Sequence, residues 1–332
     1  MYKFLVIQTA FTGDVVLATA ILEKLHQYYP DAQIDFLLRK GNEGLLEHHP
    51  YITNLLIWDK KQQKKRNLLK MALRVRKERY THIINPHRFL TSGFVMMLSG
   101  AKYRSGYSKN PLSMFFTKSS PHILSAPHSK QFVLETERYQ LLIDDITDDV
   151  PGVPKLYPTP QNFESVKQYK GQPYVCIAPS SVWFTKRFPA ARWAELINLL
   201  PEKYKIYILG APSDKELAEN IIALSGKEGV GQLCGKLNYL ESAALMKDAD
   251  MSYANDSAPL HFASAMNAPV TGVFCSTIST YGFGPQSENS RIVEIDYKLE
   301  CRPCGLHGRK KCPVGHFRCA RDIKNEQLLW WI

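Results

Sequence analysis

The regular alternation of short apolar segments with segments of helical periodicity is the feature that most constrains how this chain can fold. "KFLVIQ" precedes "VVLATAILEKLHQYYP", whose apolar residues recur at the spacing of a helix. The same alternation resumes further on, where "YVCIAP" precedes "ARWAELINLL". Strands that alternate with helices in this way are typical of β-α-β units, whose strands form a parallel sheet. The sequence therefore predicts an α/β fold.

A proline-rich stretch separates the two alternating sets. Residues 148–173 contain five prolines and no sustained periodicity, which indicates a linker. The chain of 332 residues is also about twice the length of one ordinary domain. We therefore expect two open α/β domains at residues 1–155 and 173–322, a linker at 156–172 and a C-terminal helix at 323–332. Ligands of such sheets bind beyond the carboxyl ends of the strands.

The charge of the chain implies an anionic partner but does not identify it. The formal net charge is +11, and nucleic acids, acidic lipids and phosphorylated metabolites all attract a basic protein. The basic residues are densest at 60–66 and continue to Arg79 along a predicted helix. They form either a solvated helix face or a binding patch. Because no recognition-helix, zinc-finger or RNA-binding motif accompanies them, we expect no nucleic-acid partner.

The sequence contains no sign of a membrane span or a leader. No run approaches the ~20 apolar residues that cross a bilayer. The chain begins directly with a strand-like segment, without the charged region and apolar stretch of a signal peptide. We therefore expect a cytoplasmic protein.

The turn after the first strand is the first candidate site. In "QTAFTGDVVLATAIL" the strand ends near Gln8, and Asp14 falls in the first turn of the following helix. Thr12 or Asp14 could simply cap this helix, since their side chains accept hydrogen bonds from its unpaired amides. Alternatively, Asp14 faces a cleft as a carboxylate base, and Gly13 lets another molecule approach the backbone. The glycine pattern of dinucleotide-binding turns is absent.

The loop after the strand "YVCIA" is the second candidate. In "APSSVWFTKRFPAARW", the hydroxyls of Ser181 and Thr185 precede Lys186 at the carboxyl end of a strand. Hydroxyls and an ammonium group in this position suit a phosphate, because charge-assisted hydrogen bonds to its oxygens are strong. A lone lysine in a loop is usually just solvated, and its combination with the hydroxyls is what favours a phosphate site.

The helix that follows "DMSYAN" is the third candidate. Asp256, Ser257 and Ala258 open this helix of small residues. The first amides of a helix lack internal partners and carry the positive end of its dipole, so they bind a diphosphate well. Capping alone accounts for Asp256 or Ser257. It does not account for His261 within the first turn, where the ring could donate a hydrogen bond to a phosphate oxygen.

Four cysteines gather near the C-terminus with two histidines between them. They lie in "CRPCGLHGRKKCPVGHFRC" and are Cys301, Cys304, Cys312 and Cys319, with His307 and His316. The spacing allows a structural zinc site, in which thiolates, with or without His316, complete a tetrahedron. Reduced thiols packed in a loop and disulfide bonds are the two alternatives.

Four segments of the chain together resemble glycosyltransferase family 9, the heptosyltransferases of lipopolysaccharide core assembly. They are "GDVVLATAILEKLHQYYPDAQIDFLL", "KRFPAARWAEL", "GAPSDKE" and "NDSAPLHFASAMNAPVTGVF". The resemblance implies a GT-B fold, in which two Rossmann-like domains face a central cleft. It also implies inverting, metal-independent transfer of a sugar from a nucleoside-diphosphate sugar to a glycolipid acceptor, with no cofactor required. The first domain would bind the acceptor and the second the donor, which is ADP-heptose in the well-known members.

The resemblance also implies roles for residues by their position. Asp14 would be the general base that deprotonates the acceptor hydroxyl. Lys186 would neutralise the leaving diphosphate, and Asp214 would hold the ribose. The expected donor-binding residues are Ser181, Thr185, Lys186, Asp214, Asp256, Ser257, Ala258 and His261. The expected acceptor-binding residues are Thr12, Gly13, His87 and Arg88, with simple exposure in a loop as the alternative for His87.

The implied acceptor also bears on the charge of the chain. A phosphorylated, lipid-anchored acceptor at the inner leaflet would explain both the basic helix and the net charge, so we expect peripheral association with the inner membrane. Two other functions stay open. One is a different GT-B sugar-nucleotide enzyme, such as an epimerase, which would need no acceptor. The other is a non-catalytic basic protein that binds nucleic acid or acidic lipid with a steep salt dependence.

Overall fold

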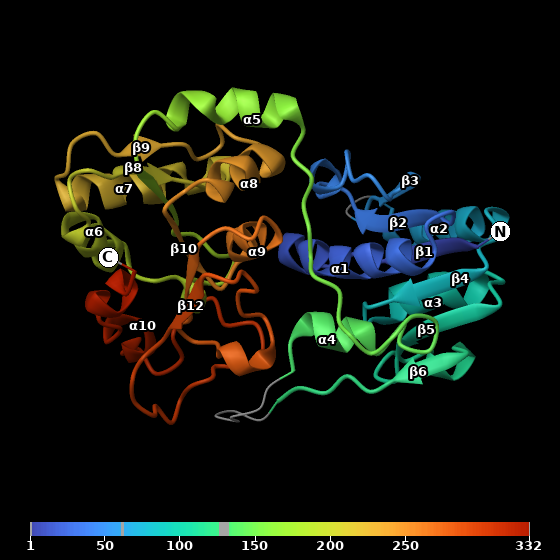
Figure 1. Ribbon diagram of the computed structural model, residues 1–332. Coiled ribbons are helices and arrows are strands. Elements are labelled where there is room, and N and C mark those ends of the chain that lie inside the picture. The colour runs from blue at the N-terminus through green and yellow to red at the C-terminus, as the bar shows by residue number, and fades with distance from the viewer. Residues whose placement is uncertain (1, 61–62, 126–132, 332) are drawn as a thin grey trace. The chain divides into compact units, whose positions relative to one another are not determined.

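The computed structural model shows an α/β chain with two parallel sheets of six strands each (Figure 1). It describes residues 2–60, 63–125 and 133–331. The alternation of strands and helices in the sequence is thereby confirmed, and so is the predicted fold class. Within these described ranges, no helix combines the length and the apolar character that crossing a bilayer requires.

The described residues divide into two compact units, each with its own sheet. The first unit comprises residues 2–124 and 133–157. The second comprises residue 125 and residues 158–331. The boundary between Tyr157 and Pro158 lies at the beginning of the expected linker.

The sheet of the first unit has the strand order β3-β2-β1-β4-β5-β6, and all neighbouring strands are parallel. The strands are β1 (Lys3–Ile7), β2 (Gln33–Arg39), β3 (Asn54–Trp58), β4 (His82–Asn85), β5 (Tyr103–Tyr107) and β6 (Lys118–Ser120). This is the doubly wound order of Rossmann domains. β2 and β3 lie on one side of β1, and β4, β5 and β6 follow on its other side. β1 and β4 therefore flank the switch point at which such sheets bind ligands.

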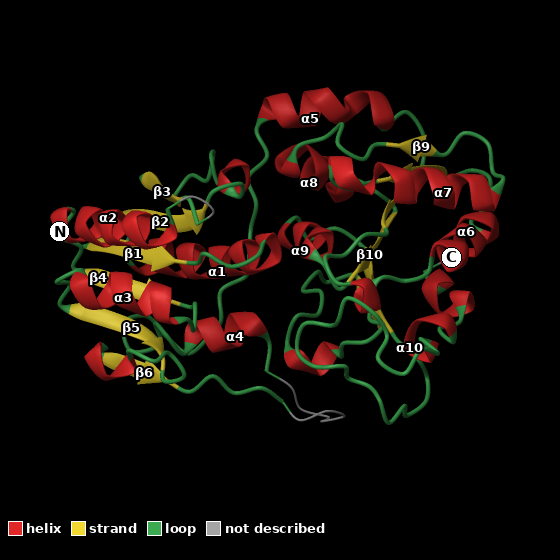
Figure 2. Cartoon of the chain, turned by 180° about the vertical axis from the view of Figure 1, so that it is seen from behind, coloured by secondary structure: helices red, strands yellow, loops and turns green. Residues whose placement is uncertain are grey.

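Helices cover both faces of this sheet. They are α1 (Thr12–Tyr28), α2 (Lys64–Lys77), α3 (Leu90–Leu98) and α4 (Glu135–Gln140), with 3-10 turns at Glu43–Leu45 and Ser113–Phe115. α1 packs against α4, and α2 packs against α3. α1 lies in front of the strands in Figure 1, whereas α2 and α3 lie in front of them in Figure 2. Leu5, Ile7, Leu37 and Val95 belong to the buried core that also includes the inner side of α2.

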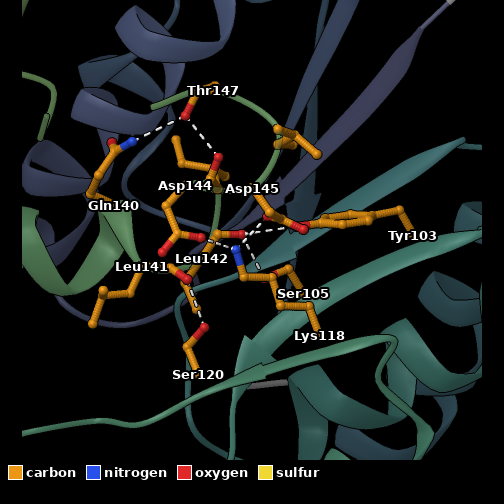
Figure 3. A network of polar contacts seen from close by, with 12 residues as sticks. Tyr103, Ser105, Lys118, Ser120, Gln140, Leu141, Leu142, Asp144, Asp145 and Thr147 are labelled. Carbon is orange, nitrogen blue, oxygen red and sulfur yellow. Dashed lines mark hydrogen bonds and ion pairs between the residues drawn. The ribbon is translucent and has the colours of Figure 1, made fainter. Parts of the chain in front are cut away.

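The segment after α4 packs on β5 and β6 (Figure 3). Ser105 Oγ in β5 donates a hydrogen bond to the Leu142 carbonyl at 2.6 Å. Lys118 in β6 forms an ion pair with Asp145, and Tyr103 OH donates to the same carboxylate at 2.7 Å. A short edge strand that side chains hold in this way offers little backbone for pairing with another sheet.

The second unit repeats this architecture with the strand order β12-β11-β10-β7-β8-β9, again with parallel neighbours. The strands are β7 (Tyr174–Ala178), β8 (Lys205–Ile208), β9 (Gly231–Gln232), β10 (Met251–Asn255), β11 (Val270–Val273) and β12 (Ser290–Val293). The helices are α5 (Pro160–Val166), α6 (Ala190–Leu199), α7 (Lys215–Ser225), α8 (Tyr239–Lys247), α9 (Ala258–Ala265) and α10 (Arg318–Arg321). The 3-10 turns are Lys167–Tyr169, Phe184–Lys186, Pro212–Asp214, Ser279–Tyr281 and Asn325–Leu329. Here β7 and β10 flank the switch point.

The expected linker at residues 156–172 contains a helix. α5 begins with Pro160 directly after Thr159, whose Oγ1 caps the helix. Proline suits the first position of a helix because its missing N–H is not needed there. α5 packs against α8, and Ser165 Oγ donates a hydrogen bond to Glu241 at 2.9 Å. The prolines that we interpret as marks of a linker therefore include a helix start.

The C-terminal segment, for which we predict a helix, forms only a 3-10 turn at Asn325–Leu329. Trp331 Nε1 donates a hydrogen bond to Tyr253 OH at 2.7 Å, and Trp330 Nε1 donates to Thr271 Oγ1 at 2.9 Å. These two bonds hold the segment against β10 and β11, with a short 3-10 helix in place of an α-helix.

Candidate active site

Polar side chains gather at the carboxyl ends of the switch-point strands in both units. In the second unit, β7 ends at Ala178 and β10 ends at Asn255, and the two strands are direct neighbours. The loops that follow them carry the two sets of residues for which we predict phosphate binding. In the first unit, β1 and β4 are direct neighbours in the same way, and Asp14 and His87 follow them.

Asn255, which we do not single out in the sequence, fixes the loop after β7. Its Nδ2 donates a hydrogen bond to the Pro179 carbonyl at 2.6 Å, and its Oδ1 accepts one from the Phe188 amide at 3.0 Å. The side chain is fully buried. The only sequence signal for this role is an amide residue at the end of the apolar strand "MSYAN".

Lys186 and Asp256 form an ion pair beside this loop. Lys186 Nζ lies 2.6 Å from Asp256 Oδ2, and both side chains are largely buried. Thr277 Oγ1 donates a hydrogen bond to the same carboxylate oxygen at 2.7 Å. Asp256 therefore holds the ammonium group in place and balances its charge in the absence of another anion.

His261 is buried near this ion pair and is neutral at physiological pH. Burial lowers the pKa of His261 to about 4, with smaller opposing effects from Asp256, which raises it, and Lys186, which lowers it. Among the side chains that the structure describes, His261 Nδ1 has no hydrogen-bond partner. A neutral imidazole offers one donor and one acceptor nitrogen. Donation from this ring to a phosphate stays a prediction.

The N-terminus of α9 has no side-chain cap. Ser257 is the N-cap residue, but its Oγ donates a hydrogen bond to the Asn255 carbonyl at 3.3 Å instead of accepting one from the helix. Asp256 is held by Lys186 and Thr277. The capping explanation is therefore wrong for both residues. The half-buried Ala258 is the first residue of this helix, Pro259 has no N–H, and the Leu260 amide donates to the Ser257 carbonyl at 3.1 Å. Amides at an uncapped helix start, such as that of Ala258, are groups that bind phosphate oxygens.

Asp214 lies in the loop after β8, next to the loop after β7. Its Oδ1 accepts a hydrogen bond from Ser180 Oγ at 2.7 Å, and its Oδ2 accepts one from the Ala211 amide at 2.8 Å. Ser181 is buried, and its carbonyl accepts a hydrogen bond from Arg187 Nε at 2.6 Å. The structure thus links Asp214 to the loop after β7 through Ser180, and the expected contact of Ser181 with the donor stays a prediction.

The cysteine-rich tail, residues 301–322, contacts the loop that carries Lys186. The Arg309 amide donates a hydrogen bond to Thr185 Oγ1 at 2.7 Å, and the Thr185 amide donates to the Arg309 carbonyl at 3.1 Å. Ser276 Oγ also donates to Thr185 Oγ1 at 2.9 Å. The fully buried Thr185, which we expect to bind the diphosphate, therefore anchors the tail in this structure.

Arg302 ties the same tail to the end of β11. Its buried guanidinium donates hydrogen bonds to three backbone carbonyls in the segment 274–277 and forms an ion pair with Glu294. Thr277, within this segment, is the residue whose hydroxyl binds Asp256. The tail therefore shapes the surroundings of the ion pair. No strand or helix pattern in the sequence marks Arg302 for this role.

The seven cysteines of the chain are all free thiols, so the disulfide alternative is wrong. Burial raises the pKa of Cys319 to about 12, and the neighbouring thiols of Cys301, Cys304 and Cys312 contribute. Cys301 Sγ lies 3.7 Å from His316 Nε2. As the described side chains lie, however, no three His, Cys, Asp or Glu residues surround a common metal position. A structural zinc ion at this cluster stays a proposal.

Asp14 lies in the first turn of α1 in the first unit. Its Oδ2 accepts a hydrogen bond from the Phe11 amide at 3.1 Å, so the carboxylate caps the helix. Thr12 Oγ1 donates to Asn42 Oδ1 at 3.1 Å, and Gly13 is the second residue of α1. The capping explanation is therefore confirmed for Asp14. The side chain is only half-buried, and its role as a base stays a prediction.

Lys60, which we treat in the sequence only as part of the basic stretch, holds the turn before Asp14. Its Nζ donates hydrogen bonds to both the carbonyl and the hydroxyl oxygen of Thr9 at 2.8 Å. Burial, together with the charges of Arg39 and Lys64, lowers the pKa of Lys60 to about 8. The cation that supports this turn is therefore lost at moderately alkaline pH.

His87 and Arg88 follow β4, the other strand of this switch point. His87 is buried, its amide donates a hydrogen bond to Asn85 Oδ1 at 3.2 Å, and its Nδ1 lies 3.2 Å from Ser92 Oγ. Burial lowers the pKa of His87 to about 3, and the charges of Lys60 and Arg88 add to this effect. The alternative of an exposed loop histidine is therefore wrong. Arg88 is half-buried, and contact of either residue with an acceptor stays a prediction.

Known proteins resemble this chain in both sequence and structure. The model of glycosyltransferase family 9 (heptosyltransferase) matches residues 68–312. Lipopolysaccharide heptosyltransferase 3 of Escherichia coli is 28% identical over 280 residues, which cover 80% of this chain and 82% of that protein. A glycosyl transferase family 9 structure from Veillonella parvula has a TM-score of 0.80 at 18% identity and covers 99% of this chain and 95% of that one. The structure of E. coli heptosyltransferase WaaC with ADP-2-deoxy-2-fluoro heptose has a TM-score of 0.69 at 19% identity and covers 87% and 92%.

The two doubly wound units and these similarities define a glycosyltransferase with a GT-B fold. More specifically, the chain belongs to glycosyltransferase family 9, the heptosyltransferase family. The family, the fold class and the enzyme class that the sequence predicts are thereby confirmed. The roles of individual residues in donor and acceptor binding stay predictions.

Proposed function

We propose that the protein transfers heptose from ADP-heptose to a phosphorylated glycolipid acceptor of the lipopolysaccharide core. Its family and the name of the E. coli relative support the reaction, and the donor analogue bound to WaaC supports the nucleotide sugar. The observation that carries the proposal is the buried ion pair of Lys186 and Asp256 close to the uncapped start of α9. A diphosphate offers negative charges that suit both the ammonium group of Lys186 and the start of α9.

In this proposal the second unit binds the donor. The diphosphate replaces Asp256 as the partner of Lys186, and the Ser257 and Ala258 amides at the start of α9 donate hydrogen bonds to its oxygens. His261 donates from its neutral ring, and Asp214 accepts hydrogen bonds from the ribose hydroxyls. These fixed donors stabilise the negative charge that develops on ADP as it leaves.

The first unit supplies the base and the acceptor contacts. Asp14 takes the proton of the acceptor hydroxyl while the hydroxyl oxygen attacks the anomeric carbon of heptose. The glycosidic bond forms as the bond to the diphosphate breaks, and the electron pair of that bond leaves with ADP. The attack comes from the side opposite the leaving group, so the anomeric configuration inverts. Arg88 and the turn around Gly13 contact the acceptor in this proposal.

Transfer in this proposal does not depend on a divalent metal, because cationic and amide groups of the protein meet the charge of the leaving group. Turnover should therefore persist in an excess of EDTA. A structural zinc ion bound by Cys301, Cys304, Cys312 and Cys319 is a separate proposal. Elemental analysis of protein purified without chelators tests it, with about one zinc ion per chain as the expected result. Protein that contains no zinc would exclude this site.

The location of the acceptor sets where such an enzyme works. A lipid-anchored core acceptor is held at the inner face of the inner membrane, and we propose that the protein works there as a peripheral protein. The net charge of +11 supports this location, because anionic leaflets attract basic proteins.

Product analysis tests the proposed function. Purified protein is incubated with ADP-heptose and a heptose-deficient core acceptor, and the products are examined by mass spectrometry and NMR. We expect ADP, an acceptor heavier by one heptose, and inversion at the anomeric carbon. Conversion of ADP-heptose without an acceptor would instead identify an epimerase-like enzyme. A thermal-shift comparison of ADP-, GDP-, UDP- and CMP-sugars identifies the donor, because a ligand of the native state raises the melting temperature.

A further inference from the structure

Helix α2 of the first unit presents a strongly basic outer surface. Seven of its 14 residues are Lys or Arg, and none is acidic. All seven side chains are exposed: Lys64, Lys65, Arg66, Lys70, Arg74, Arg76 and Lys77. Within the described ranges of the chain, none of the seven forms an ion pair with a carboxylate, and Glu78, the next residue, pairs with Lys3 instead. Glu78 also lies within electrostatic range of Arg74 and Lys77, but one carboxylate leaves most of the positive charge of the helix unbalanced.

Two leucines lie among these cations. Leu69 is 49% exposed and Leu73 is 56% exposed. Residues four apart are neighbours on one face of a helix, so the two leucines form one apolar patch. Arg66, three residues before Leu69, and Lys77, four residues after Leu73, border this patch at its two ends. Single exposed leucines are common on protein surfaces, but an adjacent pair bordered by cations is the pattern of helices that lie on membranes.

The opposite side of α2 supplies all the packing that the helix needs. Met71, Ala72 and Val75 are buried in the core of the first unit. Arg76 donates a hydrogen bond to the Leu98 carbonyl at 3.2 Å, which joins α2 to α3. Figure 2 shows α2 as an outer layer on this face of the sheet. The exposed leucines are therefore not required to hold the helix in place.

We propose that α2 docks the protein on an anionic lipid bilayer, with Leu69 and Leu73 inserted among the headgroups and the basic residues on the lipid phosphates. This inference rests on the proposed lipid-anchored acceptor, and it names the element that reaches the membrane. The first unit is also the one that carries Asp14, so the docked unit is the one that handles the acceptor. Binding of such a helix draws on both its buried apolar area and its attraction to anionic lipids.

A bilayer explains the face of α2 better than a nucleic acid does. Phosphates of either partner satisfy the Lys and Arg side chains. The pair of leucines, however, gains nothing from a phosphate backbone, whereas it gains from transfer into the apolar part of the lipid interface. The two partners therefore differ in what they require of Leu69 and Leu73.

Vesicle co-sedimentation with the full chain tests the inference. The vesicles contain phosphatidylglycerol and phosphatidylethanolamine, and phosphatidylcholine vesicles serve as the neutral comparison. We expect binding to the anionic vesicles that weakens as NaCl rises. The double variant Leu69→Ser/Leu73→Ser should bind them about tenfold less strongly. The double variant Lys70→Gln/Arg74→Gln should also bind less strongly and show a shallower salt dependence.

A matched control uses exposed leucines of the second unit. Leu199 in α6 and Leu224 in α7 are 48% and 53% exposed. The variant Leu199→Ser/Leu224→Ser should bind the vesicles like the wild type. Circular dichroism and thermal unfolding of each variant verify that the fold is retained. The inference is overturned if the wild type does not bind anionic vesicles, or if loss of the α2 leucines changes nothing. It is equally overturned if duplex DNA displaces the vesicles and binds the leucine variant as well as the wild type.

Transfer to a water-soluble acceptor separates this inference from the proposed function. With a deacylated core oligosaccharide, the α2 variants should turn over ADP-heptose at the wild-type rate, because no membrane is involved. Vesicle binding that depends on the leucines, together with no heptose transfer by any variant, would leave the docking surface in place and reject the proposed function. Vesicle binding that does not depend on the leucines, together with normal heptose transfer, would reject the docking surface and support the proposed function.

Discussion

The two units share one strand order but differ in the charged side chains at their switch points. In the second unit, Lys186 is paired with the buried carboxylate of Asp256, and Arg302 binds the segment that supports this pair. In the first unit, Asp14 is a half-buried residue of a helix turn, and Lys60 binds the carbonyl and the hydroxyl of Thr9 in the turn before it. The same architecture thus carries a buried ion pair in one unit and a helix-capping carboxylate in the other.

In the proposed function, this difference matches what each switch point must do. Rigid placement of several groups matters where charge develops on a leaving diphosphate, because preorganised donors need no rearrangement during the reaction. Proton removal needs only one correctly placed base. Substitutions in the second unit should therefore change both stability and activity, whereas substitution of Asp14 should change activity alone.

The largest expected effect is that of Asp14→Asn, which breaks the function of the first switch point and leaves its structure intact. The amide oxygen still accepts a hydrogen bond from the Phe11 amide, but the side chain no longer takes a proton. We expect the kcat for transfer to fall by about 10²–10⁴-fold. ADP release measures the rate, and thermal unfolding measures stability, which should be unchanged. Asp31→Asn, at an exposed position, is the control with normal activity. Near-normal turnover of the Asp14 variant would remove this residue from the mechanism.

Removal of the cation from the second switch point should lower activity and stability together. In Lys186→Met, kcat/KM for ADP-heptose should fall by about 10²–10³-fold, because the charge on the leaving diphosphate loses its partner. The free energy of unfolding should fall by about 3 kcal/mol, because Asp256 is left buried without its partner. Urea denaturation measures this loss.

The double variant Lys186→Met/Asp256→Asn separates the two effects. It removes the unpaired charge, so stability should return toward the wild-type value while activity stays low. A double variant as unstable as the single one would show that the ion pair is not the source of the loss.

Arg302→Gln tests whether the tail contributes to the second site or only to its fold. The guanidinium binds the carbonyl of Thr277, whose hydroxyl orients Asp256. We expect the KM for ADP-heptose to rise about tenfold with a smaller change in kcat, as a displaced binding group would cause. Steady-state kinetics measure both constants. Arg321→Gln, at an exposed position of the same tail, should behave like the wild type. An unchanged KM together with lower stability would restrict Arg302 to a structural role.

The smallest expected effect is a loss of stability in weak acid, to which both units contribute. Burial lowers the pKa of His261 to about 4 and that of His87 to about 3. The unfolded histidine has a pKa of about 6.5, so the unfolded chain binds more protons below this pH and the free energy of unfolding falls as pH falls from 6.5 toward 4. The loss should be about 1 kcal/mol per histidine between pH 6.5 and 5.5. Urea denaturation at the two pH values measures it. His261→Gln should reduce the slope, and an unchanged slope would mean that His261 is not neutral in the folded protein.

The fold could be predicted from the sequence because its main signal is local. Apolar strands and periodic helices are visible in segments such as "YVCIAP" and "ARWAELINLL", and their alternation already indicates parallel sheets. The errors fall where a local signal has two meanings. Pro160 is consistent with a linker and with the first residue of a helix, and only its packing on α8 distinguishes them. The C-terminal segment has helical composition, but its tryptophans bind side chains of distant strands.

The candidate site was predictable only in part for the same reason. The positions of Lys186, Asp256 and Asp14 follow from where strands end and helices begin, and parallel strands bring such ends to one edge of a sheet. Arg302 in the tail contacts the Cys275 carbonyl, and Thr185 contacts Arg309 in the tail. The partners in each contact lie more than 20 positions apart in the sequence. No local pattern encodes such a contact. It arises only when the tail returns to the end of β11.

The ion pair of Lys186 and Asp256 has a consequence for selectivity among the small anions of the cell. The ammonium group of Lys186 already has a counter-ion at 2.6 Å, the carboxylate of Asp256. This counter-ion is part of the protein and cannot diffuse away. A chloride or a single carboxylate brings one charge and must displace an equal one, so it gains little by entering. In the proposed function, a diphosphate carries several linked negative charges, so it meets Lys186 and still has oxygens left for amides at the start of α9. We therefore expect the site in the second unit to prefer polyvalent anions over chloride.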